Sequence, residues 1–211
     1  MAISKANFNS FNVTPTASKF ITFNSSNNGL AADDVGGALK LISTQTASSS
    51  ATIDFTSGID STYKEYIFKY INIHPANDGQ YFQVNFRDGG SSFDSTKTTT
   101  AFEAYHNEAG SAQTLQYLDG EDLAQSTSFQ NLTTIDNDND ATGSGTLHLF
   151  DPSNTTFVKH FLANINCFDN NVCKLTHIAG YCNTTSAIDG AQFKMSSGNI
   201  DSGVIKLYGV S

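Results

Sequence analysis

The sequence has little positive charge. Lysine and arginine together number 11 against 20 aspartates and glutamates, so the formal net charge is −9, and Arg87 is the single arginine among 211 residues. Proteins that bind nucleic acids use lysine and arginine to neutralise phosphates, and an acidic surface repels a phosphate backbone. The composition therefore argues against a nucleic-acid partner.

Long apolar runs are also missing. No stretch of the sequence approaches the ~20 consecutive apolar residues that a membrane-spanning helix needs, which argues against membrane insertion. The first ten residues are polar and lack the basic-then-apolar order of a secretion signal. We therefore expect the chain to stay in the compartment where it is made.

Cysteine is scarce, and tryptophan is absent. The three cysteines are Cys167, Cys173 and Cys182, and they lack the paired C-x-x-C spacing of zinc sites. An odd number also argues against a framework of disulfides. We interpret all three as small buried thiols. The alternative is that Cys167 and Cys173 pair across the turn-like stretch between them.

The sequence is rich in hydroxyl and amide residues, with aromatic residues spaced among them. From residue 51 onward, apolar and polar residues alternate, as in Phe82, Val84 and Phe86, and this period of two is typical of half-buried β-strands. Clusters of Gly, Asn, Asp and Ser separate the segments, which indicates a β-sandwich or barrel rather than a parallel α/β sheet. The predicted strands are 51–55, 66–73, 82–87, 101–106, 114–118, 129–135, 146–150, 156–165, 174–181, 191–195 and 204–208.

Residues 1–29 have a different pattern from the rest of the chain. Their large apolar residues are too sparse to form a core, and they are surrounded by Asn, Ser and Thr. We predict an extended arm whose aromatic side chains bury on the surface of another protein. The predicted anchoring residues are Phe8, Phe11, Phe20 and Phe23.

Residues 31–43 carry the one helical pattern. Val35, Leu39 and Ile42 are spaced by four and then three positions, which predicts one apolar stripe on a short helix. Two adjacent glycines weaken such a helix by about 1 kcal/mol each relative to alanine. A helix this short is not stable alone, so we predict that the stripe packs on the domain or on copies of itself. Residues 44–50 are predicted to be a linker.

Few residues suggest catalysis. A glycosidase needs two carboxyl groups about 5–9 Å apart, and Glu103 and Glu108 with Asp119 are candidates, although solvated loop carboxylates are the simpler interpretation. The sequence contains no G-x-S-x-G, P-loop or G-x-G-x-x-G motif. We predict no catalytic residues and no cofactor.

Metal binding is suggested by one acidic stretch. Residues 136–140 read Asp-Asn-Asp-Asn-Asp, but an EF-hand would need Gly and Glu where this chain has Ala141 and Leu147. A polar hairpin loop is the main interpretation, and a looser calcium site on a loop is the alternative. Histidines on three predicted strands would cluster only if those strands are neighbours, and we predict no metal site; they are His148, His160 and His177.

Two stretches resemble parts of virion proteins of tailed bacteriophages. Residues 30–42, Leu-Ala-Ala-Asp-Asp-Val-Gly-Gly-Ala-Leu-Lys-Leu-Ile, are similar to the A-x-D-V-x-x-A-L-x-x-L segment of phage fibre proteins, where it forms a short trimer-associating helix; the two glycines depart from that pattern. Residues 53–68 and 71–78 resemble the opening of jelly-roll or lectin-like modules in virion proteins, especially those of phages of marine bacteria and cyanobacteria. The resemblance is close over 30–87 and carries no catalytic motif.

Together these observations predict an all-β fold. We expect a jelly-roll-like antiparallel β-sandwich at residues 51–211, preceded by an extended N-terminal arm at 1–29 and a short oligomerising helix and linker at 30–50. The resemblance implies a non-enzymatic virion structural protein, either a tail or head fibre or a capsid decoration protein. Its implied partners are other virion proteins (capsid, tail or adaptor) and copies of itself in a homotrimer. It would be assembled in the host cytoplasm and reside in the virion.

Two alternatives remain from the residues. The first is a carbohydrate-binding, lectin-like module that recognises a glycan on the host surface. Such modules use aromatic platforms, and the tyrosines available are Tyr63, Tyr81, Tyr105, Tyr117, Tyr181 and Tyr208. The second is a polysaccharide-cleaving enzyme that uses Glu103 or Glu108.

Overall fold

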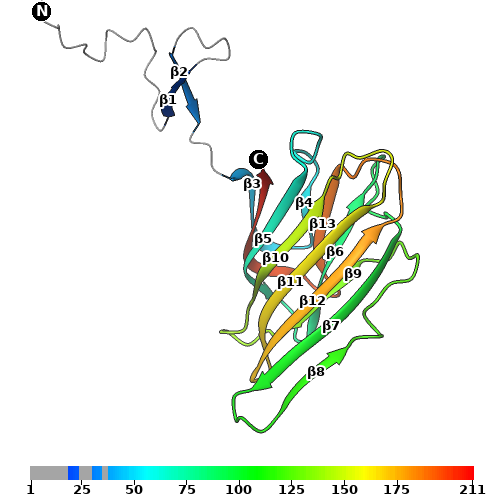
Figure 1. Cartoon of the computed structure of the whole chain (residues 1–211). Coiled ribbons are helices and arrows are strands. Elements are labelled where there is room, and N and C mark those ends of the chain that lie inside the picture. Colours follow the sequence, from blue (N-terminus) through cyan, green and yellow to red (C-terminus); the bar gives the residue numbers. More distant parts are fainter. Residues whose placement is uncertain (1–18, 24–29, 35–37) are drawn as a thin grey trace, which may run out of the picture. The chain divides into compact units, whose positions relative to one another are not determined.

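The computed structural model describes residues 19–23, 30–34 and 38–211, and those residues form strands, turns and loops without any helix (Figure 1). The chain divides into two compact units, residues 1–38 and residues 39–211. In the first unit, β1 (Lys19–Phe23) pairs antiparallel with β2 (Leu30–Asp34). The second unit is a β-sandwich.

The sandwich unit contains the remaining strands. They are β3 (Leu39–Ser50), β4 (Ile53–Phe55), β5 (Glu65–Pro75), β6 (Gln80–Arg87), β7 (Lys97–Asn107), β8 (Gln113–Tyr117), β9 (Gln130–Ile135), β10 (Gly143–Phe150), β11 (Lys159–Asp169), β12 (Val172–Cys182), β13 (Gly190–Met195) and β14 (Ile200–Val210). Every strand predicted from the alternating pattern is present, because the turn residues and the period of two locate each one.

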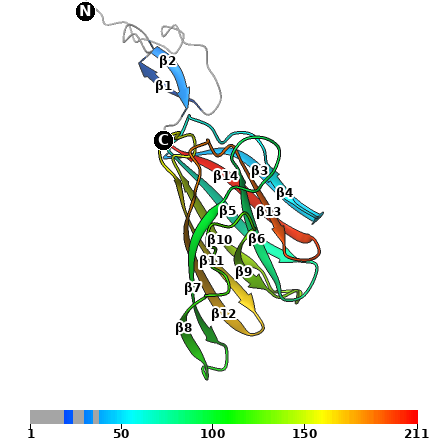
Figure 2. The ribbon, with the colours of Figure 1, turned by 90° about the vertical axis from the view of Figure 1, so that its right-hand side faces the viewer.

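Two antiparallel sheets make up the sandwich. The large sheet has eight strands in the order β3-β14-β5-β10-β11-β12-β7-β8, and the small sheet has four in the order β4-β13-β6-β9. Figure 2 shows the two layers from the side. The chain crosses from one sheet to the other at most connections, for example from β5 to β6 and from β12 to β13. The predicted all-β, jelly-roll-like antiparallel sandwich is therefore confirmed.

Aromatic side chains fill one half of the space between the sheets. The ring of Phe193, on β13, is within 5.2–6.1 Å (centroid to centroid) of four other rings, those of Phe55, Phe68, Tyr70 and Phe82. All five side chains are buried. A large aromatic side chain removes 150–250 Å² from water when buried, so this cluster supplies much of the burial that stabilises the sandwich.

The predicted helix at 31–43 is wrong over the residues that the structure describes. Leu30–Asp34 forms β2, and the strand β3 begins at Leu39. The reason is that Leu39 and Leu41 also satisfy a period of two, and β3 gains a ladder of hydrogen bonds with β14 that a glycine-containing helix cannot match. Val35 lies outside the described residues.

The predicted linker at 44–50 is also wrong, because these residues belong to β3. Pairs such as Thr46 with Val204 and Ser50 with Ile200 continue the ladder between β3 and β14. The sandwich unit therefore begins at Leu39 instead of residue 51. Serine and threonine are common on an exposed edge strand, and their side chains here are mostly exposed.

Candidate functional site

The first unit contains one group of anchoring residues predicted from the sequence. Phe23 in β1 is 75% exposed and Ile21 is 47% exposed, so neither is covered within the two-stranded sheet. Phe20 lies in β1 in register with Asp33. The two remaining predicted anchors, Phe8 and Phe11, fall outside the described residues.

Of the predicted self-association stripe, Leu39 and Ile42 lie in the strand β3, and Val35 falls outside the described residues. Leu39 lies in β3 opposite Val210 and is 40% exposed. Ile42 is half-buried and packs against the core of the sandwich, on the irregularity where the register with β14 shifts. A side chain that serves the interior of its own domain is not available for a contact between copies.

A polar pocket lies between the two sheets, on the side of the sandwich where β6 and β9 face β7 and β12. Its volume is about 160 Å³. The residues that line this polar pocket are Tyr81, Glu103, Leu118, Glu121, Asn131, Leu132, Thr133, Thr134, Lys174 and Thr176. Polar residues at positions that face the other sheet are unusual, since such positions normally carry the core.

The alternation of β7 and β12 explains how these polar groups come to face inward. Ala101 pairs with Ile178 and both are fully buried, so these two positions mark the inner face. Two residues further along each strand, Glu103 pairs with Thr176, and side chains two apart lie on the same face. At these positions the inner face of the sheet thus changes from an apolar pair to a polar pair.

Lys174 is the cation of the pocket, and its side chain is only 9% exposed. Its ammonium group donates hydrogen bonds to Thr134 Oγ1 and to Asp169 Oδ2. Thr134 Oγ1 also donates to Asp169 Oδ2 at 2.9 Å. A buried ammonium group is tolerated only when it is paired and hydrogen-bonded in this way.

Glu121 forms the opposite wall. Its carboxylate accepts a hydrogen bond from Asn131 Nδ2, and Asn131 Oδ1 in turn accepts one from Gln83 Nε2 at 2.6 Å. The hydrogen bond to Glu121, together with burial and the charges of Glu121 and Glu103, raises the pKa of Tyr81 to about 12. The Tyr81 hydroxyl is therefore protonated at neutral pH. Glu103 accepts a hydrogen bond from Gln116 Nε2 at 2.8 Å.

Hydroxyl groups complete the lining. Thr176 Oγ1 donates to Thr133 Oγ1 at 3.1 Å, and Thr133 Oγ1 also lies 3.3 Å from the thiol of Cys167. Each hydroxyl can donate one hydrogen bond and accept two. The polar pocket therefore presents carboxylates, an ammonium group, an amide and hydroxyls, all held by neighbours, beside the apolar side chains of Leu118 and Leu132.

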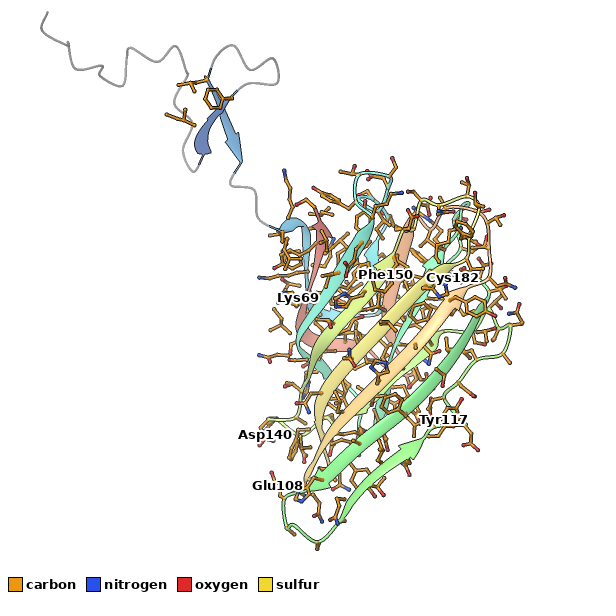
Figure 3. All side chains as sticks on the ribbon, in the orientation of Figure 1. Lys69, Glu108, Tyr117, Asp140, Phe150 and Cys182 are labelled. Carbon is orange, nitrogen blue, oxygen red and sulfur yellow. The ribbon has the colours of Figure 1, made fainter. Side chains whose placement is uncertain are left out.

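The carboxyl groups considered for a glycosidase do not share the polar pocket. Glu103 lines the polar pocket, while Glu108 lies beyond the end of β7, in the turn toward β8 (Figure 3). Asp119 does not line the pocket either. The second carboxylate in the lining is Glu121, which sequence reasoning missed because its loop carries no alternating pattern.

The three histidine-bearing strands are neighbours, as the sequence analysis required for a cluster. Their histidines nevertheless stand in different rows: His148 is in register with Leu162, His160 with Tyr181 and His177 with Asn164. Across residues 19–23, 30–34 and 38–211, no group of three or more His, Cys, Asp or Glu side chains is arranged to hold a metal ion.

The acidic stretch 136–140 makes one close contact with another carboxylate. Asp136 and Asp78 share a hydrogen bond, which raises the pKa of Asp78 and lowers the pKa of Asp136. Both side chains are solvated.

All three cysteines are free thiols, and the interpretation that all three are buried is wrong for Cys173. Cys167 is in register with Lys174 and buried, while the exposed Cys173 is in register with Phe168, one position further along β11. Adjacent positions of a strand point to opposite faces, so Cys167 and Cys173 do not pair. Burial raises the pKa of the buried thiols Cys167 and Cys182 to about 11.

A comparison of the sequence with known protein families finds no matching family, and a comparison with curated proteins finds none that is significantly similar. Within the described ranges there is also no helical segment with the length and hydropathy of a membrane span. Two features of the structure therefore bear on function: the exposed apolar residues of β1 and the polar pocket.

Proposed function

We propose that the chain is a structural protein of a bacteriophage virion, a fibre or capsid decoration protein, that docks through its N-terminal unit and displays the β-sandwich. The observation that carries this proposal is the exposure of Phe23 and Ile21 on a two-stranded sheet. The sandwich needs no such help, because its core consists of its own buried side chains. The two units therefore suit different tasks, one for attachment and one for display.

The physical argument concerns the stability of the β1–β2 pair. A two-stranded sheet is at best marginally stable in water, and this one leaves the side chains of Ile21 and Phe23 exposed. Covering a phenylalanine or isoleucine fully on a partner contributes roughly 1.5–3 kcal/mol each. In a trimer the three arms would act together, so that avidity strengthens a weak individual contact.

The proposal is non-enzymatic and includes self-association. Because Leu39 and Ile42 belong to a strand of the sandwich, the association is assigned to β1 and β2 together with the residues before them. Phe8 and Phe11 remain predicted anchors. The acidic composition agrees with a role that involves neither nucleic acid nor membrane.

Sedimentation analysis of the full chain tests the association. We expect the wild type to form trimers with increasing concentration, and we expect Ile21→Ser/Phe23→Ser and a chain of residues 39–211 to stay monomeric. The truncation ends at 38 because β3 belongs to the sandwich. Phe157→Ser is the matched control, since Phe157 is 69% exposed but lies on the sandwich.

Location tests the virion role directly. Antibodies against residues 39–211 should label purified particles of the phage that encodes the chain at regular positions. Particles that carry no copy of the chain would refute the proposal. A monomeric wild type at all concentrations would refute the homotrimer alone.

A further inference from the structure

We propose that the polar pocket binds one ring of a small, neutral, hydroxyl-rich molecule of the saccharide class. This inference does not depend on the virion role, because it concerns a pocket enclosed by the sandwich alone. It differs from recognition on an exposed tyrosine platform: only Tyr81 among the tyrosines considered for that role lines the pocket.

The size of the pocket sets the first limit. The volume of the pocket is about 160 Å³. This is below the 300 Å³ or more of pockets for drug-sized ligands. An extended chain does not fit inside, whereas a single small polyol or the terminal ring of a longer saccharide does.

The chemistry of the lining sets the second limit. A sugar hydroxyl both donates and accepts hydrogen bonds, so its site needs acceptors and donors side by side. Glu103 and Glu121 supply acceptors, Lys174 and Asn131 supply donors, and the threonines supply both. Leu118 and Leu132 supply apolar surface for the C–H face of a ring.

Charge narrows the ligand class further. Two carboxylates line the pocket, and the ammonium group of Lys174 is already paired with Asp169. An anionic ligand would therefore be repelled by Glu103 and Glu121. A metal ion is disfavoured because the described residues offer no group of three suitable ligands. A neutral ligand is not repelled by the two carboxylates and does not need three metal ligands.

The polar groups are held in place before any ligand arrives. Lys174 is fixed by Thr134 and Asp169, and Glu121 is fixed by Asn131, which Gln83 holds in turn. Side chains that are already ordered lose little conformational entropy on binding, which favours affinity in a small site. Most of the donors and acceptors come from strands of both sheets, and Glu121 comes from the loop between β8 and β9. The spacing of the strand residues is set by the sandwich itself.

Titration of the full chain with methyl glycosides tests the inference. The panel contains neutral glucose, galactose, mannose and fucose, the acids glucuronate and galacturonate, and the amine glucosamine, read by isothermal titration and saturation-transfer NMR. We expect at least one neutral glycoside to bind saturably and its acidic counterpart to bind at least tenfold more weakly. Matching oligosaccharides distinguish the source: tighter binding indicates the end of a chain, and equal binding indicates a free sugar.

Two variants connect binding to the pocket. Thr176→Val keeps the shape but removes a hydroxyl, and we expect about fivefold weaker binding of the neutral glycoside. Glu121→Gln keeps the shape but removes a charge, so discrimination against the acid should decrease. Thr146→Val, on β10 in register with Lys69 and Asn164, is the matched control and should bind as the wild type does. Melting temperatures verify that each variant folds.

Several outcomes would overturn the inference. They are the absence of saturable binding by every neutral glycoside and oligosaccharide, binding of the acid as tight as that of the neutral sugar, tighter binding of glucosamine than of glucose, and an unchanged affinity in Thr176→Val. Release of reducing ends from an oligosaccharide would show that the site acts on its ligand, and it would still support recognition of a saccharide in the pocket.

Discussion

The two halves of the sandwich interior follow the same alternation of strands but are filled in opposite ways. Where β5 faces β13, the inner positions carry aromatic rings such as Phe68 and Phe193, 5.2 Å apart. Where β7 and β12 face β9, they carry Glu103, Lys174 and Thr176. The comparison teaches that one half supplies stability through burial, and that the other is tolerated because its polar groups bond to one another.

The largest effect is expected in the aromatic half. Phe193→Ala removes a fully buried ring that contacts four others, and we expect the free energy of unfolding to fall by about 3–5 kcal/mol. Urea denaturation of the two proteins measures the difference.

The control for this change is a phenylalanine outside the interior. Phe157 is 69% exposed, so Phe157→Ala should change the free energy of unfolding by less than about 0.5 kcal/mol. Equal losses in the two variants would mean that the aromatic cluster does not carry the stability assigned to it.

A smaller effect is expected from breaking the polar half. Lys174→Met leaves Asp169 and Thr134 without their ammonium partner, and we expect a loss of about 1–3 kcal/mol in the free energy of unfolding. The double variant Lys174→Met/Asp169→Asn also removes the unpaired carboxylate. It should recover part of the loss, and denaturation of all four proteins in the cycle gives the coupling energy.

An unchanged free energy of unfolding in Lys174→Met would contradict the account of the polar half. It would show that the polar half is not held by this ion pair and that the lining of the pocket is free to rearrange. Methionine has nearly the volume of lysine, so packing alone does not explain a loss.

The strands of the sandwich could be predicted from the sequence because each short segment carries its own signal. Alternation as in Phe82, Val84 and Phe86 fixes the period, and turn residues fix the ends. The helix at 31–43 was wrong because Leu39 and Ile42 fit a helical spacing while Leu39 and Leu41 fit a strand. Pairing with β14 decides between them, and that contact is far away in the sequence.

The polar pocket could be predicted only in part. Glu103 and Thr176 share a parity with the buried residues Ala101 and Ile178, and this is a signal that they face inward. In the sequence, polar residues that face inward cannot be told apart from polar residues on the exposed face of a strand. The alternation alone therefore does not show which face of the strand is buried. Glu121 reaches the same pocket because of the conformation of the loop between β8 and β9. No local sequence pattern predicts that conformation.

The smallest expected change in the free energy of unfolding concerns Lys97. This residue is a buried cation that belongs neither to the aromatic half nor to the polar pocket. It is fully buried, in register with Cys182, and its ammonium group donates to Asn85 Oδ1 and to the Ser95 carbonyl. Burial lowers the pKa of Lys97 from 10.5 to about 8. Between these pH values the unfolded chain binds more protons, so this residue's contribution to stability becomes more favourable as pH rises.

The measurement is therefore a comparison with Lys97→Met across pH. The free energy of unfolding of the wild type should rise by about 1 kcal/mol relative to that of Lys97→Met from pH 8 to pH 9, because the folded protein releases the Lys97 proton before the unfolded chain does. The thiols of Cys167 and Cys182 have raised pKa values, so their contribution to stability decreases as pH rises above 9. Both proteins contain these thiols, so their contribution largely cancels in the difference between the two free energies of unfolding. A gap that stays constant with pH would mean that Lys97 titrates as it does in the unfolded chain, and that its hydrogen bonds offset the full cost of burying its charge.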